Sequence, residues 1–304
     1  MAISRAQLVK ELEPGLNALF GLEYKRYDNQ HAEIYTNESS DRAFEEEVML
    51  SGFANANVKV EGSGVNYDQS QETYTARYTH DTIALAFAIT EEAIEDNLYD
   101  KISSRYTKAL ARSMSNAKQV KAAAPLNNGL PSVDGFDSGD GKSLFNTAHT
   151  TVSGTNVKNT LTTQADLNET SLEQALIDIS AFTDERGLRV AAKGMKMIIP
   201  SANQFSAERL LKSQGRTGTA DNDINAVASM GMVPQGYRVN NFLTDSDSWY
   251  IITDVPNGMK MFTRAPLTTA MEGDFDTGNV RYKARERYSF GVSDYRGIFG
   301  CEGA

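Results

Sequence analysis

A regular hydrophobic pattern first appears at residues 83–89, where large apolar side chains alternate with alanine. This alternation predicts a β-strand with one bulky face and one small-residue face, both of which a folded protein can cover. The bulky positions are Ile83, Leu85, Phe87 and Ile89, and the small ones are Ala84, Ala86 and Ala88.

A helical pattern follows at once. Thr90 is placed to cap a helix whose first turns carry Glu91 and Glu92, where the helix dipole favours acids. Apolar residues then recur mostly every four positions, and Pro125 is expected to end the helix. A helix over 90–124 is about 50 Å long, enough to span the whole body of a compact protein of this size. The four-residue step disfavours a coiled coil, which needs alternating steps of three and four.

Residues 58–80 alternate in the manner of two strands, with residues 68–71 as a plausible turn between them. Their large apolar residues are only valines and tyrosines, so a long ribbon of this kind is marginal alone in water. It must lie on something, and we expect a second copy of the chain. The alternative is a hairpin folded back on its own domain.

The remaining pattern predicts an α+β fold. A polar connection fills 126–168, a capping box at 170–173 begins a helix, and a buried strand is expected at 195–199. A further helix reaches about Leu211. Short strands are expected at 237–239, 249–253 and 259–263.

The N-terminal fifty residues carry less signal. A short amphipathic segment is expected to break at Pro14. The apolar residues that follow it are too sparse to predict a hydrophobic core. The acidic run at 44–48 predicts a solvated helical face or turn, with contact to basic residues of a neighbouring molecule as the alternative.

The strand predicted at 280–292 places four cations on one face and mostly apolar residues on the other. Such a row needs acidic partners or a polyanion. We favour pairing between subunits, with acids near 45–47 or 91–96, over contact with nucleic acid. The cations are Arg281, Lys283, Arg285 and Arg287.

Charge and composition narrow the function classes. A net charge of −10 disfavours a general nucleic-acid binder but suits a container that must not grip DNA tightly. The longest apolar run, 83–89, is too short to cross a membrane. The single Cys301 cannot form an internal disulfide, which fits a reducing, cytoplasm-like compartment.

Candidate chemistry is sparse. The three histidines, His31, His80 and His149, lie far apart and show no metal-ligand spacing, so we interpret them as structural or surface residues. We expect no catalytic, cofactor-binding or metal-binding residues and therefore no enzyme.

One stretch imitates a nucleotide site. Gly141 and Lys142 stand in "DSGDGKS" like the end of a phosphate-binding loop, and Asp254 ends an apolar strand as a magnesium ligand would. However, position 136 is Phe where such a loop needs glycine, and poor helix formers follow. A P-loop-like NTPase is thus the weaker alternative to a plain surface turn.

Three blocks carry a resemblance: "YTARYTHDTIALAFAITEEAIEDNLYD" (74–100), "DGKSLFNTAH" (140–149) and "FGVSDYRGIFG" (290–300). In this order they resemble the major capsid proteins of tailed phages, specifically the Mu-like head subunit group with the Hong Kong 97-type fold. The likeness runs from about residue 40 onward.

The resemblance implies a division of the chain and a way of assembling it. Subunits of this family overlap with their neighbours and form hexamers and pentamers of an icosahedral shell around viral DNA. The implied parts are an N-terminal arm (1–50), an extended β-hairpin loop (51–88), a peripheral domain with a spine helix (89–134), an axial domain (135–275) and a C-terminal strand returning to the peripheral domain (276–304).

The resemblance also implies partners and contact residues. It implies a portal, cement proteins and weak, non-specific contact with packaged double-stranded DNA, but no membrane, in a virion component assembled in the host cytoplasm. The short arm leads us to expect a separate scaffolding protein. Some members form a lysine–asparagine bond between subunits, and Lys59 is the lysine of the extended loop, although no motif places its partners. The expected inter-subunit contacts are Lys59, Tyr67, Tyr74, Tyr78, Glu91, Glu92, Arg281, Lys283, Arg285 and Arg287.

The leading hypothesis is therefore a capsid subunit with no cofactor. A second is the shell of an encapsulin-like nanocompartment enclosing cargo enzymes. Shells that contain nucleic acid favour the first, and small shells that contain protein favour the second.

Overall fold

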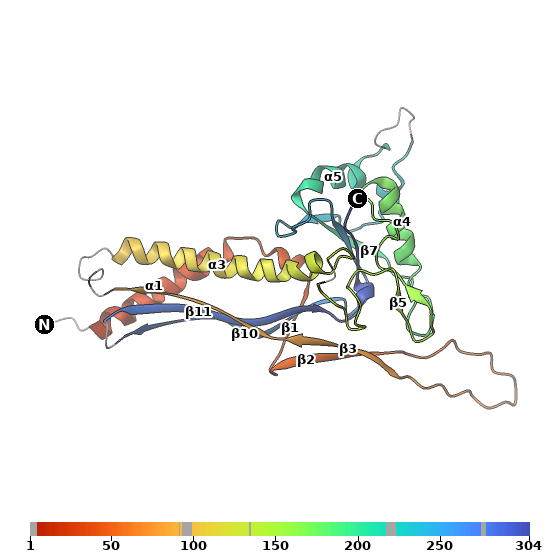
Figure 1. Ribbon diagram of the computed structural model, residues 1–304, viewed down its shortest axis with the longest axis horizontal. Coiled ribbons are helices and arrows are strands. Elements are labelled where there is room, and N and C mark those ends of the chain that lie inside the picture. The colour runs from red at the N-terminus through yellow and green to blue at the C-terminus, as the bar shows by residue number, and fades with distance from the viewer. Residues whose placement is uncertain (1–4, 91, 93–98, 134, 217–222, 275–277) are drawn as a thin grey trace.

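The computed structural model describes residues 5–90, 92, 99–133, 135–216, 223–274 and 278–304, with side chains from residue 14 onward except those of 99–102. The chain is elongated (Figure 1). One half is a long sheet with two helices beside it, and the other half is a second sheet with shorter helices. A hairpin with a long loop extends past the second half.

The long sheet has the strand order β1 (Thr36–Ser39), β10 (Met259–Gly273), β11 (Val280–Val292), β4 (Asp81–Ile89). β1 runs parallel to β10, and the other pairs are antiparallel. The strands expected at 83–89 and 280–292 are confirmed. β10 is much longer than the strand expected at 259–263, and it pairs with β11 along its length, so the expected boundary at residue 275 falls inside one sheet.

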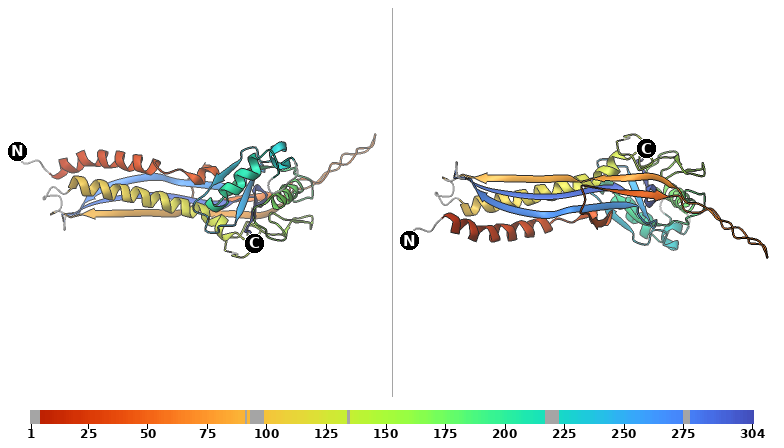
Figure 2. Two further views of the ribbon diagram at one scale, coloured as in Figure 1. Left: turned by 90° about the horizontal axis from the view of Figure 1, so that it is seen from above. Right: turned by 90° about the horizontal axis from the view of Figure 1, so that it is seen from below.

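Helices α1 (Arg5–Lys25) and α3 (Tyr99–Asn128) cover one face of this sheet. Figure 2 shows both helices on the same side of the strands. The long helix is confirmed, although its expected first turns lie mostly outside the described residues. Its predicted end at Pro125 is wrong, because α3 continues through this proline to Asn128.

The N-terminal segment also differs from the expectation. α1 continues through Pro14 without a break. Leu16 and Phe20 are buried against Leu110 and Met114 of α3, and they stabilise the helix beyond the proline. Residues 1–50 therefore do contribute to a core, contrary to the sequence-based prediction.

The second sheet has the order β12 (Ile298–Cys301), β9 (Trp249–Thr253), β7 (Gly194–Ile199), β8 (Tyr237–Val239). Its helices are α4 (Glu169–Ser180), α5 (Gln204–Lys212) and α6 (Ala226–Met230). The helix expected after residue 170 is confirmed, but its cap is Asn168, which forms a capping box with Ser171. The short elements are η1 (Gln30–Glu33), β5 (His149–Thr150), β6 (Asn156–Val157), η2 (Ser201–Asn203) and η3 (Tyr295–Gly297).

The projecting hairpin pairs β2 (Phe44–Leu50) with β3 (Glu72–Thr79). The acidic run at 44–48 is thus a strand, and the helical or turn prediction for it was wrong. Residues 51–71 form no strand, so the predicted ribbon with a turn at 68–71 was also wrong. We call these residues the extended loop from here on, a narrower range than the expected 51–88. With few large apolar residues, this loop has little to bury against itself.

Candidate functional site

The three sequence blocks that carry the resemblance meet at one place, where the long sheet, the second sheet and the hairpin join. We call this place the junction. Its polar residues are Asp140, His149, Asn159, Glu185, Asp294, Tyr295 and Arg296.

Arg296 is the centre of the junction and is 2 % exposed. Its guanidinium donates to a Glu185 carboxylate oxygen at 2.6 Å, to Asp294 Oδ1 at 3.2 Å and to the Thr183 carbonyl at 2.8 Å. Burial raises the pKa of Asp294, and Arg296 opposes that shift. A buried guanidinium with two carboxylates and a carbonyl has its charge and its donors satisfied within one chain.

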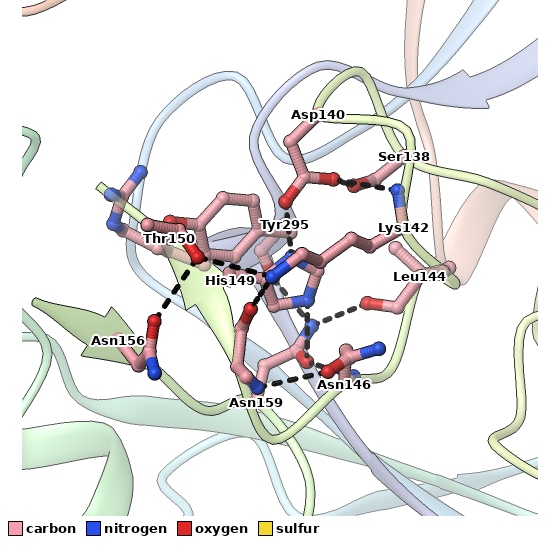
Figure 3. Close-up of polar contacts among 12 residues, drawn as sticks. Ser138, Asp140, Lys142, Leu144, Asn146, His149, Thr150, Asn156, Asn159 and Tyr295 are labelled. Carbon is pink, nitrogen blue, oxygen red and sulfur yellow. Dashed lines mark hydrogen bonds and ion pairs between the residues drawn. The ribbon is translucent and has the colours of Figure 1, made fainter. Parts of the chain in front are cut away.

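His149 lies flat against the Tyr295 ring, 3.9 Å between centroids, and is fully buried (Figure 3). Its Nδ1 is 2.7 Å from Asp140 Oδ2, and its Nε2 is 3.2 Å from Asn159 Oδ1. Burial raises the pKa of Asp140, but hydrogen bonds from His149 and Ser138 outweigh this effect, so the pKa is lowered. The interpretation of His149 as a structural residue is confirmed.

The hairpin is attached to the junction through two tyrosines. Tyr74 packs near Tyr295 and directly over Gly139, where a Cβ atom would collide with the ring. Tyr78, 2 % exposed, makes a short hydrogen bond to Ser293. Both tyrosines were expected as inter-subunit contacts, but Tyr78 is enclosed by its own chain and has no surface to offer a neighbour.

The glycine-rich turn beside the junction is not a phosphate-binding loop. Lys142 Nζ bonds Thr150 Oγ1 at 3.1 Å and the Ala148 carbonyl, so its ammonium is already engaged (Figure 3). The next helix, α4, begins only at Glu169, so the turn does not open a helix as a phosphate-binding loop does. Asp254, the candidate magnesium ligand, accepts the backbone N–H of Lys193 at 2.8 Å.

Other candidate chemistry is equally engaged in packing. Across the described ranges, no three or more of the side chains His, Cys, Asp and Glu gather as metal ligands would. Cys301 is fully buried, and burial raises the pKa of its thiol, which disfavours the reactive thiolate. No described helix has the length and apolarity to cross a bilayer.

The extended loop, by contrast, exposes its side chains. Val58 is 94 % and Tyr67 97 % exposed, and Lys59 is exposed beside them. A few hydrogen bonds link its two arms, among them Ala54 N–H to the Asp68 carboxylate at 2.7 Å. Large apolar side chains in water on both arms indicate a surface that another molecule covers.

The second open surface is the face of the long sheet that α1 and α3 leave bare (Figure 2). The predicted row of cations lies there in register with alanines: Arg281 beside Ala88, Lys283 beside Ala86. In the described part of the chain, Arg281 pairs with Asp274, whereas Lys283 and Arg285 make no ion pair. This part of the sheet face therefore carries small and cationic side chains. Arg285 pairs in the ladder with Ala84, and Arg287 with Thr82.

The acids proposed as partners for these cations have other roles. Glu46 pairs with Arg77 at 3.8 Å and Glu47 with Lys260 at 2.5 Å, while Glu45 accepts a hydrogen bond from Ser40. Since all three are engaged within the chain, the 45–47 run is a poor partner for the cations of another copy. Glu92 is exposed, and Glu91 lies outside the described residues.

Sequence reasoning missed the residues that join these regions. Arg296 and Asp294 were present in the quoted block "FGVSDYRGIFG", but nothing in their spacing named Glu185 as the partner. Arg186, the next residue, donates to Asp68 of the extended loop at 2.8 Å. Pairs more than a hundred residues apart leave no local signal.

Comparison with known proteins gives one family. Residues 73–300 match the sequence model of the family described as phage capsid protein. This stretch contains all three resemblance blocks in full. No curated protein matches the chain in sequence.

Solved structures agree on the fold. The capsid of an empty GTA particle is 13 % identical, with a TM-score of 0.59 over 92 % of this chain and 91 % of that chain. A virus-like particle from Pyrococcus furiosus is 11 % identical, with a TM-score of 0.52 over 94 % and 98 %. The capsid of Myoviridae phage XM1 is 12 % identical, with a TM-score of 0.51 over 89 % of each chain. The α+β Hong Kong 97-type capsid fold is thus confirmed.

Proposed function

The chain belongs to the family of phage capsid proteins, and from this premise we propose that its copies assemble as hexamers and pentamers into an icosahedral shell around phage DNA. The family is structural and not enzymatic, and its members are components of the virion. The extended loop is the observation that supports assembly most directly. Its valines and Tyr67 are left in water by the chain's own fold.

Overlap between subunits gives this surface a partner. Large permanent interfaces bury apolar surface that a lone subunit leaves exposed. Six members of the predicted contact set lie on the extended loop and on the bare sheet face, where Arg287 is half-buried. The exposed ones are Lys59, Tyr67, Arg281, Lys283 and Arg285. We propose these six as inter-subunit contacts, together with Glu92 and with Glu91, which lies outside the described residues. Lys59 is also the candidate for a covalent link.

The finer assignments remain part of this proposal. We place the chain in the Mu-like head subunit group and propose its division into arm, extended loop, peripheral domain, axial domain and C-terminal strand. β10 is grouped with the peripheral domain, because it pairs with β11 in the long sheet. Portal, scaffolding and cement proteins are its expected partners, and packaged DNA its weak, non-specific one. The net charge of −10 supports a wall that holds DNA loosely.

Negative-stain microscopy of the purified protein tests the proposal. We expect closed icosahedral shells or ring-shaped capsomers. Particles that carry protein cargo and no nucleic acid, judged by their ultraviolet absorbance, would favour the nanocompartment alternative. A protein that stays monomeric at high concentration, with or without its scaffolding partner, would contradict the proposed function.

A further inference from the structure

A single carboxylate connects both arms of the extended loop to the body of the molecule. Asp68 Oδ2 accepts the Ala54 N–H at 2.7 Å, and Asp68 Oδ1 accepts the Gln69 N–H at 2.9 Å. Arg186 donates to Asp68 Oδ1 at 2.8 Å and reaches the Gln69 carbonyl at 3.4 Å. The loop is thus closed by Asp68 and attached by Arg186.

Arg186 stands on a firmly held turn. Asp184 Oδ1 accepts the N–H groups of Arg186 at 2.9 Å and Leu188 at 2.7 Å, and Gly187 takes a φ of +85° that favours glycine. Glu185 is anchored by Arg296 in the junction. The turn is therefore fixed on both sides of Arg186, which makes the guanidinium a stationary point for the loop.

The loop itself has little else to fix it. Of the described residues outside the hairpin, Arg186 is the one whose side chain hydrogen-bonds residues 51–71. Each arm is about ten residues, so the tip lies about 30 Å from the base at about 3.3 Å per residue. A swing of about 20° at the base would move the tip by about 10 Å, more than the width of two strands in a sheet.

We propose that Arg186 is a positioning residue, which sets the direction of the extended loop through Asp68 before the loop meets a neighbouring copy. This rests on the proposed function, because a neighbour is what the loop must reach. The contact acts by pre-organisation: a loop already aimed at its docking surface loses less conformational freedom when it docks. The free subunit then presents one loop direction and not a broad range of them.

The Arg186–Asp68 pair is suited to orienting the extended loop and not to stabilising the fold. The side chains of Arg186 and Asp68 are 24 % and 40 % exposed. Exposed ion pairs add little to global stability, so their removal should leave the core intact. Loss of the contact is expected to slow shell formation about two- to fivefold, the range that corresponds to the free energies measured for such pairs.

A graded series at one position tests the proposal. Arg186→Lys keeps the charge, Arg186→Ala removes it, and Arg186→Glu places like charges together. The matched control is Arg189→Ala, an exposed arginine at the end of the same turn that makes no ion pair in the described structure. Spin labels at Ser63→Cys and Ser180→Cys report the distance between the loop tip and α4 in unassembled subunits, and light scattering reports shell formation.

We expect a narrow distribution of distances between the two labels for the wild type, Arg186→Lys and Arg189→Ala. The distribution should be broader for Arg186→Ala and broadest for Arg186→Glu. Assembly rates should fall in the same order at an unchanged melting temperature. High salt should remove the extra defect of Arg186→Glu, since the screening length is then only about 3 Å at 1 M.

Three results would overturn the proposal. The first is an equal distance between the labels throughout the series. The second is faster assembly of Arg186→Ala, because the pair would then restrain the loop, and the third is a defect in Arg186→Ala that Arg189→Ala shares. The label distances are measured on free subunits. If the wild type never forms shells, the proposed function is contradicted. The label distances still show whether Arg186 orients the extended loop.

Discussion

Glu185 and Arg186 are neighbours in the chain, yet they serve two regions that follow opposite rules. Glu185 points into the junction, where Arg296 and its partners satisfy one another inside a single subunit. Arg186 points to the extended loop, where valines and Tyr67 remain in water. The difference teaches that buried charges must find their partners within one chain, whereas exposed apolar surface can be covered by a second copy during assembly.

The largest effect is expected from breaking the junction. Arg296→Ala leaves Glu185 and Asp294 buried without a cation, a change that costs about 3–5 kcal/mol of unfolding free energy. This loss is a large fraction of the stability of an ordinary domain, which is about 5–15 kcal/mol. Urea denaturation of the variant checks this, with Arg209→Ala on α5 as an exposed control. A variant as stable as the wild type would show that the junction is not required for folding.

Removing the loop should give the opposite result. A short Gly-Ser link in place of residues 55–67 keeps Ala54, Asp68 and the whole of β3. We expect the melting temperature to stay within a few degrees while shells disappear from electron micrographs. A wider deletion, of residues 60–76, would be a poor test, because Ala76 is buried and Tyr74 packs at the junction. Normal shells from the shortened chain would show that assembly does not require the extended loop.

Acid should lower the folding stability of the protein through His31, which lies away from the junction. Burial first, and then Lys118, lowers the pKa of His31 from 6.5 to about 4, while Gln119 opposes the shift. The unfolded chain binds the proton near pH 6.5 and the folded chain only near pH 4, so the His31 contribution is complete above pH 6.5 and is lost as pH falls toward 4.

With allowance for solvent screening, that loss is on the order of 2 kcal/mol. Melting temperatures between pH 4 and 7 measure it. His31→Gln can still accept from Gln119 but cannot titrate, so its stability should fall less steeply over this window. Parallel curves for the two proteins would show that His31 does not couple folding to pH.

The smallest effect is expected on the bare sheet face. Lys283→Glu with Arg285→Glu should change the unfolding free energy by less than about 0.5 kcal/mol, because both side chains are exposed. Shell assembly should be slower and respond differently to salt, since charges at an interface act mainly on association. Lys108→Glu on α3 is the control. Equal assembly kinetics at every ionic strength would exclude this face as a charged contact.

Sequence periodicity was sufficient where a segment's own side chains decide its structure. The alternation at 83–89 and the four-residue step of α3 both predicted their elements, and the row from Arg281 to Arg287 was placed on the correct face. Prediction failed where distant residues decide. The run at 44–48 is a strand because Tyr78 and its neighbours in β3 supply a partner, and α1 passes Pro14 because Phe20 packs on α3.

The candidate site was predictable in the same uneven way. The open loop could be foreseen, because residues 51–71 contain too few large apolar side chains to form a core. The junction could not, since the contacts of Arg296 with Glu185 and of Tyr78 with Ser293 join residues more than a hundred positions apart.

Hydrogen exchange of residues 51–71, compared between unassembled subunits and purified shells, tests the central claim most directly. We predict fast exchange in the free subunit, where these residues form no strand, and strong protection in the shell, where a neighbour covers the loop. Equal exchange in both states, with the junction protected in each, would contradict the claim that the extended loop is completed by another copy of the chain.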